Sequence, residues 1–226
     1  MKKKLVFGLG TGRCGSASLA SLMSLQKNTH ASHELFPILP WEHDLPLLTR
    51  KWEQLDHQSH LFDVVFDSGS YYFPYVPVLW NSWHQHDYAR DRYDLRFVCL
   101  RRDKSETIES YLTKFSKQNN NPLQNHNDPN LHTDEWDLSF PKYDGISLRQ
   151  ALSKYYDTYY ATCQFWESKY TENFKIGWKL WITLSILKNL STSWKIKLKS
   201  FKKQTPSLEL ISLKRSMLFK IRWMDL

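Results

Sequence analysis

Apolar and polar positions alternate along this chain of 226 residues in a way that predicts strands followed by helices. Short runs predict strands at 5–9, 30–33, 62–66 and 95–100. Segments with apolar residues at helical spacing predict helices at 16–25, 45–55, 74–86, 105–116 and 146–170. Strands that alternate with helices favour a parallel sheet covered on both faces. We therefore expect an α/β fold of three layers, αβα, with a central parallel sheet.

A glycine-rich turn joins the first predicted strand to the first predicted helix. It contains Gly10, Gly12 and Gly15 around the single cation Arg13. Glycines let the backbone approach a ligand closely and adopt positive φ without steric cost. A helix that begins directly after such a turn directs backbone N–H groups and its positive dipole end at an anion. The turn therefore predicts a cradle for phosphate or a phosphate-like group.

Two nucleotide-binding motifs resemble this turn in part. A Walker A loop has the same spacing between its glycines, but Ser16 stands where that motif requires lysine. The dinucleotide fingerprint G-x-G-x-x-G matches Gly10, Gly12 and Gly15, and Glu34 lies near the acidic position that this motif expects about 20 residues on. The turn alone leaves both interpretations open.

A second segment of the sequence helps to decide which kind of anion the glycine-rich turn binds. The apolar strand at 95–100 runs into Arg101, Arg102 and Asp103, and Ser110 and Tyr111 follow on the next predicted helix. A guanidinium fork and a hydroxyl suit a phosphate monoester. Together with the first turn, this segment resembles the sulfotransferase family, whose donor is 3′-phosphoadenosine 5′-phosphosulfate (PAPS). Lys104 departs from the family pattern, which has proline there.

The resemblance covers about residues 1–176 and implies a fold like that of the P-loop nucleotide hydrolases. It assigns the donor's 3′-phosphate to Arg102 and Ser110. It assigns the donor's 5′-phosphosulfate to the first turn and the start of its helix, namely Gly12, Arg13, Cys14, Gly15, Ser16, Ala17 and Ser18. Ala17 stands where a second loop hydroxyl is common in the family.

The resemblance also implies the chemistry. Sulfuryl transfer needs a base for the acceptor proton, and many sulfotransferases use a glutamate near the position of Glu34. His33 is the alternative base, because imidazole titrates near neutral pH. Arg13 would stabilise the charge that develops on the leaving phosphate. The family requires no metal. Asp67 follows the third predicted strand and either lines the same cleft or caps the next helix.

Composition limits the remaining possibilities. Three scattered cysteines indicate free thiols, and the sequence shows neither a signal peptide nor a membrane span, so we expect a cytoplasmic protein. We expect residues 116–145 to form a long polar loop or lid, or else a disordered insertion. Residues 177–226 carry eleven Lys and Arg against two acids, a net charge of +9. This tail fits a basic interaction surface, a solvated helical face or a divergent chain end, and the last interpretation predicts poor order after residue 176.

These observations predict a sulfotransferase that acts on a hydroxyl or amine acceptor. The acceptor class (small molecule, glycan or lipid) and the oligomeric state stay open, and no specific nucleic acid is expected as a partner. Two alternatives stay open as well. One is a non-catalytic, nucleotide-binding remnant with a basic tail, and the other is a nucleotide or small-molecule kinase.

Overall fold

The computed structural model describes residues 2–115, 135–170, 180–182 and 219–221. The strands are β1 (Lys3–Leu9), β2 (Thr29–His33), β3 (Val64–Ser68), β4 (Tyr93–Cys99), β5 (Leu180–Ile182) and β6 (Phe219–Ile221). The helices are α1 (Ser16–Met23), α2 (Leu45–Leu61), η1 (Ser70–Tyr75, a 3₁₀ helix), α3 (Val76–Gln85), α4 (Asp87–Arg92), α5 (Lys104–Phe115), α6 (Glu135–Leu138) and α7 (Leu148–Tyr170).

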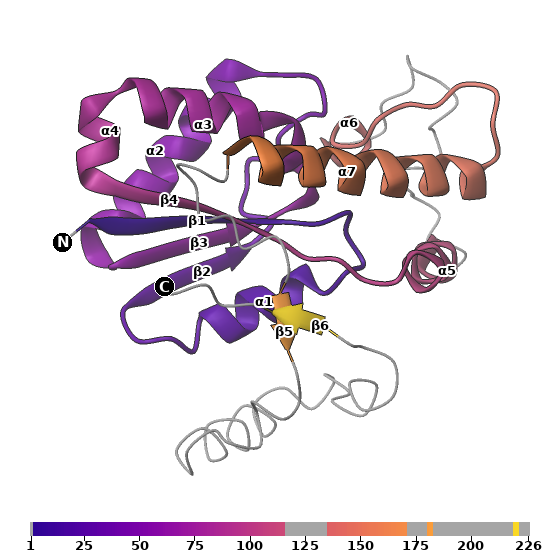
Figure 1. Cartoon of the computed structure of the whole chain (residues 1–226), viewed down its shortest axis with the longest axis horizontal. Helices are drawn as coiled ribbons and strands as arrows, with labels where there is room; N and C mark the ends of the chain where they lie inside the picture. Colours follow the sequence, from indigo (N-terminus) through magenta and orange to yellow (C-terminus); the bar gives the residue numbers. More distant parts are fainter. Residues whose placement is uncertain (1, 116–134, 171–179, 183–218, 222–226) are drawn as a thin grey trace, which may run out of the picture.

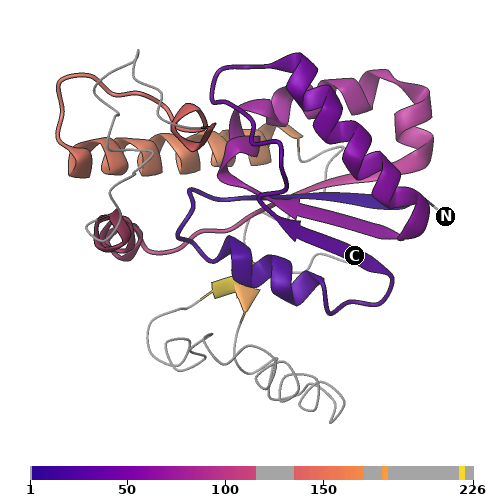
Figure 2. The ribbon, with the colours of Figure 1, turned by 180° about the vertical axis from the view of Figure 1, so that it is seen from behind.

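Four parallel strands form the central sheet in the order β2-β3-β1-β4 (Figure 1). The chain leaves β1 toward β2 through α1 and returns to β3 through α2. The first connection crosses the sheet toward β2, and the second crosses it in the opposite direction. Because connections between parallel strands are right-handed, α1 and α2 therefore lie on opposite faces of the sheet. Both views show α1 on one face of this sheet and α2, α3 and α7 on the other (Figures 1 and 2). The predicted α/β architecture with a parallel sheet is confirmed.

Two hydrophobic cores lie on the two faces of this sheet. Leu5, Phe7 and Leu9 of β1 pack into the larger core with residues of α2, α3 and α7. Val6 points the other way and packs with Leu19 and other residues of α1. Successive side chains of a strand alternate between faces, so β1 supplies both cores.

The predicted elements differ most from the structure in two places. Helix α2 continues to Leu61, and the amide of Phe62 closes it by donating to the carbonyl of Gln58 at 3.0 Å. Phe62 therefore ends a helix instead of starting a strand, and β3 begins at Val64. The helix predicted at 74–86 divides at Tyr75, where the 3₁₀ turn η1 gives way to α3.

Asp67 and Lys51 form a buried ion pair between β3 and α2. Their side chains are 0% and 1% exposed, and Lys51 Nζ lies 3.5 Å from Asp67 Oδ2. Lys51 Nζ also donates to the carbonyl of Pro37 at 3.0 Å and to the Tyr71 hydroxyl at 3.1 Å. Burial lowers the pKa of Lys51 to about 8, and the charge of Asp67 opposes this shift. Both interpretations of Asp67 from the sequence are wrong, because it neither lines an open cleft nor caps a helix.

Aromatic side chains fill part of the larger core, and two segments named in the sequence analysis lie mostly outside the described residues. The aromatic residues Tyr71, Tyr72, Phe73 and Trp80 are buried in the larger core. Most of the polar loop at 116–145 lies outside the described residues, as does the tail at 177–226 apart from β5 and β6, which pair in antiparallel fashion. The prediction about order after residue 176 therefore stays a prediction. No helix in the described ranges is long and apolar enough to cross a membrane.

Replacing the buried lysine tests the ion pair. Lys51→Met keeps a similar volume but leaves the Asp67 carboxylate buried without its cation. We expect a loss of about 3–5 kcal/mol in the free energy of unfolding, measured by urea denaturation. Lys104→Met, which removes the solvent-facing ion pair with Asp157, is the matched control and should cost about 0–1 kcal/mol. Equal losses in the two variants would contradict this account of Lys51.

Candidate functional site

Three loops meet at the carboxyl edge of the sheet, where ligands bind in open α/β sheets. They follow β1, β2 and β4 and carry Arg13, Glu34 and Arg102. Strand pairing aligns their starting points, since Leu9 pairs with Cys99 and His33 pairs with Ser68. The fold thus brings the residues predicted from two distant motifs to one edge.

The first loop adopts left-handed backbone conformations at three residues. The φ angles are 79° at Gly12, 54° at Arg13 and 101° at Gly15. Gly15 is the N-cap of α1 and makes no side-chain capping hydrogen bond. The first N–H groups of a helix have no partner within it, so the amides of Ser16, Ala17 and Ser18 are available to an anion. Arg13, Ala17 and Ser18 are solvent-exposed.

Cys14 takes a different position from the rest of the loop. Its side chain is fully buried in the smaller core, next to Gly10. Burial raises the pKa of the Cys14 thiol to about 12, and Cys99 adds to this effect. A buried, protonated thiol cannot contact a ligand at the loop surface. Cys14 can take part in binding only through its backbone.

Arg102, Arg13 and Ser110 lie in direct contact. Arg102 Nη1 donates to the carbonyl of Arg13 at 3.2 Å, and Arg13 Nε donates to Ser110 Oγ at 3.2 Å. Arg102 Nε also forms an ion pair with Glu106 at 3.0 Å, one turn into α5. A guanidinium has five N–H donors, so these contacts leave others for a bound anion. Two cationic side chains and one hydroxyl therefore lie together beside the first loop.

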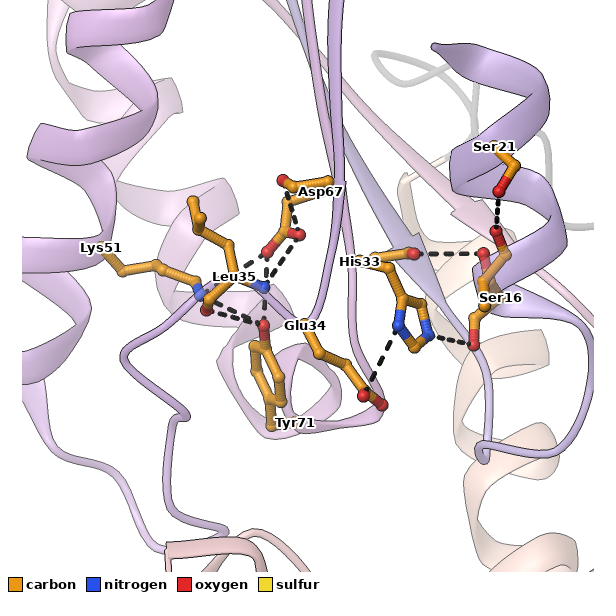
Figure 3. Close-up of polar contacts among 11 residues, drawn as sticks. Ser16, Ser21, His33, Glu34, Leu35, Lys51, Asp67 and Tyr71 are labelled. Atoms are coloured by element: carbon orange, nitrogen blue, oxygen red, sulfur yellow. Dashed lines mark hydrogen bonds and ion pairs between the residues drawn. The ribbon is translucent and has the colours of Figure 1, made fainter. Parts of the chain in front are cut away.

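Ser16, His33 and Glu34 form a second group (Figure 3). Ser16 Oγ lies 2.9 Å from His33 Nε2, and His33 Nδ1 lies 3.5 Å from Glu34 Oε2. Burial raises the pKa of Glu34. The negative charge of Asp67 adds to this shift, and the positive charges of Lys114 and Arg13 oppose it. Burial lowers the pKa of His33. The negative charge of Asp67 opposes this shift, and the positive charge of Lys114 adds to it. At neutral pH, His33 is therefore a neutral imidazole that can accept a proton.

Asp67 of the buried ion pair, together with Ser68, holds the backbone on both sides of Glu34. Asp67 Oδ1 accepts hydrogen bonds from the amide of Leu35 at 3.3 Å and from Ser32 Oγ at 2.8 Å. The amide of Glu34 donates to the carbonyl of Ser68 at 2.8 Å. Glu34 has a φ of 56°, which is uncommon outside glycine. These contacts hold the strained residue in place.

Tyrosine hydroxyls hold the backbones of the first and third loops, and the sequence analysis missed this role. Tyr111 of α5 donates to the carbonyl of Thr11. Tyrosines of α7 make the other contacts: Gly10 N donates to Tyr159 at 2.8 Å, Tyr160 donates to Leu100 O at 2.6 Å, and Tyr156 donates to Arg102 O at 2.5 Å. Spacing of tyrosines along a helix predicts a buried face but not which backbone groups the hydroxyls reach.

The described residues contain no cluster of three or more His, Cys, Asp or Glu side chains that could hold a metal ion. His84 and His86 are solvent-exposed. No model of a known protein family matches this chain, and no curated protein matches it.

Gly12 and Gly145 provide a matched test of the loop geometry. Both have positive φ, 79° and 69°, but a Cβ at Gly12 would overlap Tyr111 Oη whereas one at Gly145 meets nothing within 4 Å. Gly145→Ala should cost only the strain of the left-handed backbone, about 1–2 kcal/mol. Gly12→Ala should cost about 1 kcal/mol more, because Tyr111 must release its hydrogen bond.

The measurement is urea denaturation of both variants, of Tyr111→Phe, and of the double variant that combines Gly12→Ala with Tyr111→Phe. Removing the hydroxyl makes room for the new methyl group, so the double variant should lose less than the two single losses combined. If the two single losses in the free energy of unfolding simply add in the double variant, the Tyr111 hydroxyl does not limit the room for a side chain at Gly12.

Proposed function

We propose that this protein is a sulfotransferase that uses PAPS as its sulfuryl donor. The observation that carries the proposal is the contact between two motifs far apart in sequence. Arg13 Nε bonds Ser110 Oγ, and Arg102 Nη1 bonds the carbonyl of Arg13, both at 3.2 Å. The side chains that the family resemblance assigns to opposite ends of one donor therefore lie next to each other at one sheet edge.

In the proposed binding mode, the first loop receives the donor's 5′-phosphosulfate. The uncapped amides at the start of α1 and the exposed Arg13 side chain supply its positive potential. Arg102 and Ser110 receive the 3′-phosphate. A parallel sheet with an anion-binding loop between β1 and α1 also supports the finer proposal of a P-loop-like fold.

In the proposed reaction, Glu34 takes the proton of an acceptor hydroxyl or amine while the acceptor atom bonds to sulfur. The bond between sulfur and the 5′-phosphate oxygen breaks, and 3′-phosphoadenosine 5′-phosphate leaves. Arg13 and the loop amides stabilise the negative charge on this leaving group. The raised pKa of Glu34 suits a base that operates near neutral pH. His33 is the alternative base, and the acceptor is a small molecule, a glycan or a lipid.

Calorimetry with 3′-phosphoadenosine 5′-phosphate tests donor binding, with 5′-AMP and ADP as controls. We expect micromolar affinity that depends on the 3′-phosphate. Arg102→Ala removes a charged hydrogen-bond donor and should weaken binding about 10- to 100-fold. Arg149→Ala, which removes an exposed arginine paired with Glu109, is the matched control and should bind as the parent does.

Folded protein with no preference for the 3′-phosphate would overturn the donor site. Tight ADP binding with magnesium-dependent phosphoryl transfer from ATP would instead support the kinase. Donor binding without sulfuryl transfer to any acceptor class would support the non-catalytic remnant.

Turnover should depend on pH through the base. Because the base must be deprotonated, the rate should rise as pH increases through the raised pKa of Glu34, above the ordinary 4.5. Glu34→Gln should keep 3′-phosphoadenosine 5′-phosphate binding and lower turnover by about 10²–10⁴. His33→Asn should retain part of the rate. The reverse ranking of the two variants would make His33 the base.

A further inference from the structure

Ser16, His33 and Glu34 lie in the order nucleophile, base and carboxylate. The hydroxyl of Ser16 is 2.9 Å from His33 Nε2, and the opposite ring nitrogen is 3.5 Å from Glu34 Oε2 (Figure 3). This order activates a serine in hydrolases of unrelated folds, where geometry and roles define the site and sequence position does not. The sulfuryl transfer proposed above does not require Ser16 to act as a nucleophile.

The surroundings of Ser16 fit such a role. Ser16 is the first residue of α1 and follows a turn with left-handed residues at Arg13 and Gly15. A serine on a sharp turn from strand to helix can use the amide of the next residue to bind an oxyanion. Here that amide belongs to Ala17, in the uncapped first turn of α1. Ser68 Oγ donates to the carbonyl of Ser16 at 3.3 Å and holds it in position.

His33 and Glu34 also have the required properties. Both side chains are about one quarter to one third exposed, so a substrate can reach them while water is partly excluded. Burial favours the neutral form of His33, which can accept the serine proton. Glu34 Oε2 lies 3.5 Å from the other ring nitrogen, where a carboxylate favours the tautomer that has its proton on Nδ1 and Nε2 as the acceptor.

We propose that Ser16 is a nucleophile that hydrolyses small carboxylic esters, an activity separate from sulfuryl transfer. Ser16 Oγ bonds to the ester carbonyl carbon, and its proton passes to His33 Nε2. The Ala17 amide stabilises the tetrahedral oxyanion. The carbon–oxygen bond to the alcohol then breaks, and the alcohol leaves with the proton from His33. Water then attacks the acyl carbon and gives a proton to His33 Nε2. The bond between the acyl carbon and Ser16 Oγ breaks, His33 returns the proton to Ser16 Oγ, and the carboxylic acid leaves.

Labelling with a fluorophosphonate probe tests this activity in the full chain. We expect covalent modification of Ser16, located by mass spectrometry of the peptide that contains it, and hydrolysis of p-nitrophenyl acetate. His33→Ala should lower both rates by about 10²–10⁴, and Ser16→Ala should abolish the labelling. Circular dichroism of each variant confirms that it is folded.

Ser21→Ala is the matched control on the same helix. Its hydroxyl donates to the carbonyl of Ala17 at 3.0 Å and lies away from His33 (Figure 3), so both rates should stay at the parent level. Labelling spread over several serines, or equal labelling of the parent and His33→Ala, would overturn the proposal.

Protection by 3′-phosphoadenosine 5′-phosphate separates this proposal from the sulfotransferase proposal. Slower labelling in its presence would support both, because a donor on the loop covers Ser16. Labelling at Ser16 with neither binding nor protection would support the esterase and count against the donor site. Binding with no labelling would overturn the esterase and leave the donor site standing.

Discussion

The Asp67–Lys51 pair is the interaction on which the candidate site depends. A carboxylate with no solvent exposure is stable only when it is paired and hydrogen-bonded. Lys51 supplies the counter-charge from α2, and Tyr72 donates to Asp67 Oδ2 at 2.5 Å. The other oxygen of this carboxylate accepts hydrogen bonds from Ser32 Oγ and from the amide of Leu35. A charge in the core thereby fixes the chain direction directly after Glu34.

Tyrosines of α5 and α7 hold the loops that follow β1 and β4. They do so with hydrogen bonds between uncharged hydroxyls and the backbone instead of with a buried charge. The first loop has left-handed residues at Gly12, Arg13 and Gly15, and such conformations persist only when the surrounding structure holds them. Each hydroxyl has a rigid ring behind it and reaches one backbone group near Gly10, Leu100 or Arg102. Because α7 contacts both the first and the third loop, it fixes their separation. That separation determines which ligand can span Arg13 and Arg102.

Sequence reasoning found the elements whose signals are local. The apolar runs of β1 and β4, the glycine turn and the helix that follows β4 all lie close to their predicted positions, because propensity and periodicity act within a few residues. It failed at the boundary between α2 and β3, where Phe62 fits both a strand and a helix end. It also missed the pairing of Lys51 with Asp67. A lysine among polar neighbours on a helix predicts a solvated face, and only the tertiary fold buries it.

The candidate site likewise divides into parts that spacing reveals and parts that it does not. The spacing of Arg102 and Ser110 predicts that they share a face, and their contact with Arg13 is consistent with this. Sequence order places His33 and Glu34 side by side, yet it does not place Ser16 against the imidazole, because that contact depends on the position of α1 over β2. An anion on the first loop competes for the same hydroxyl that His33 holds. An anion bound at the first loop and the hydrogen bonding of the His33 ring are thus physically coupled through the Ser16 hydroxyl.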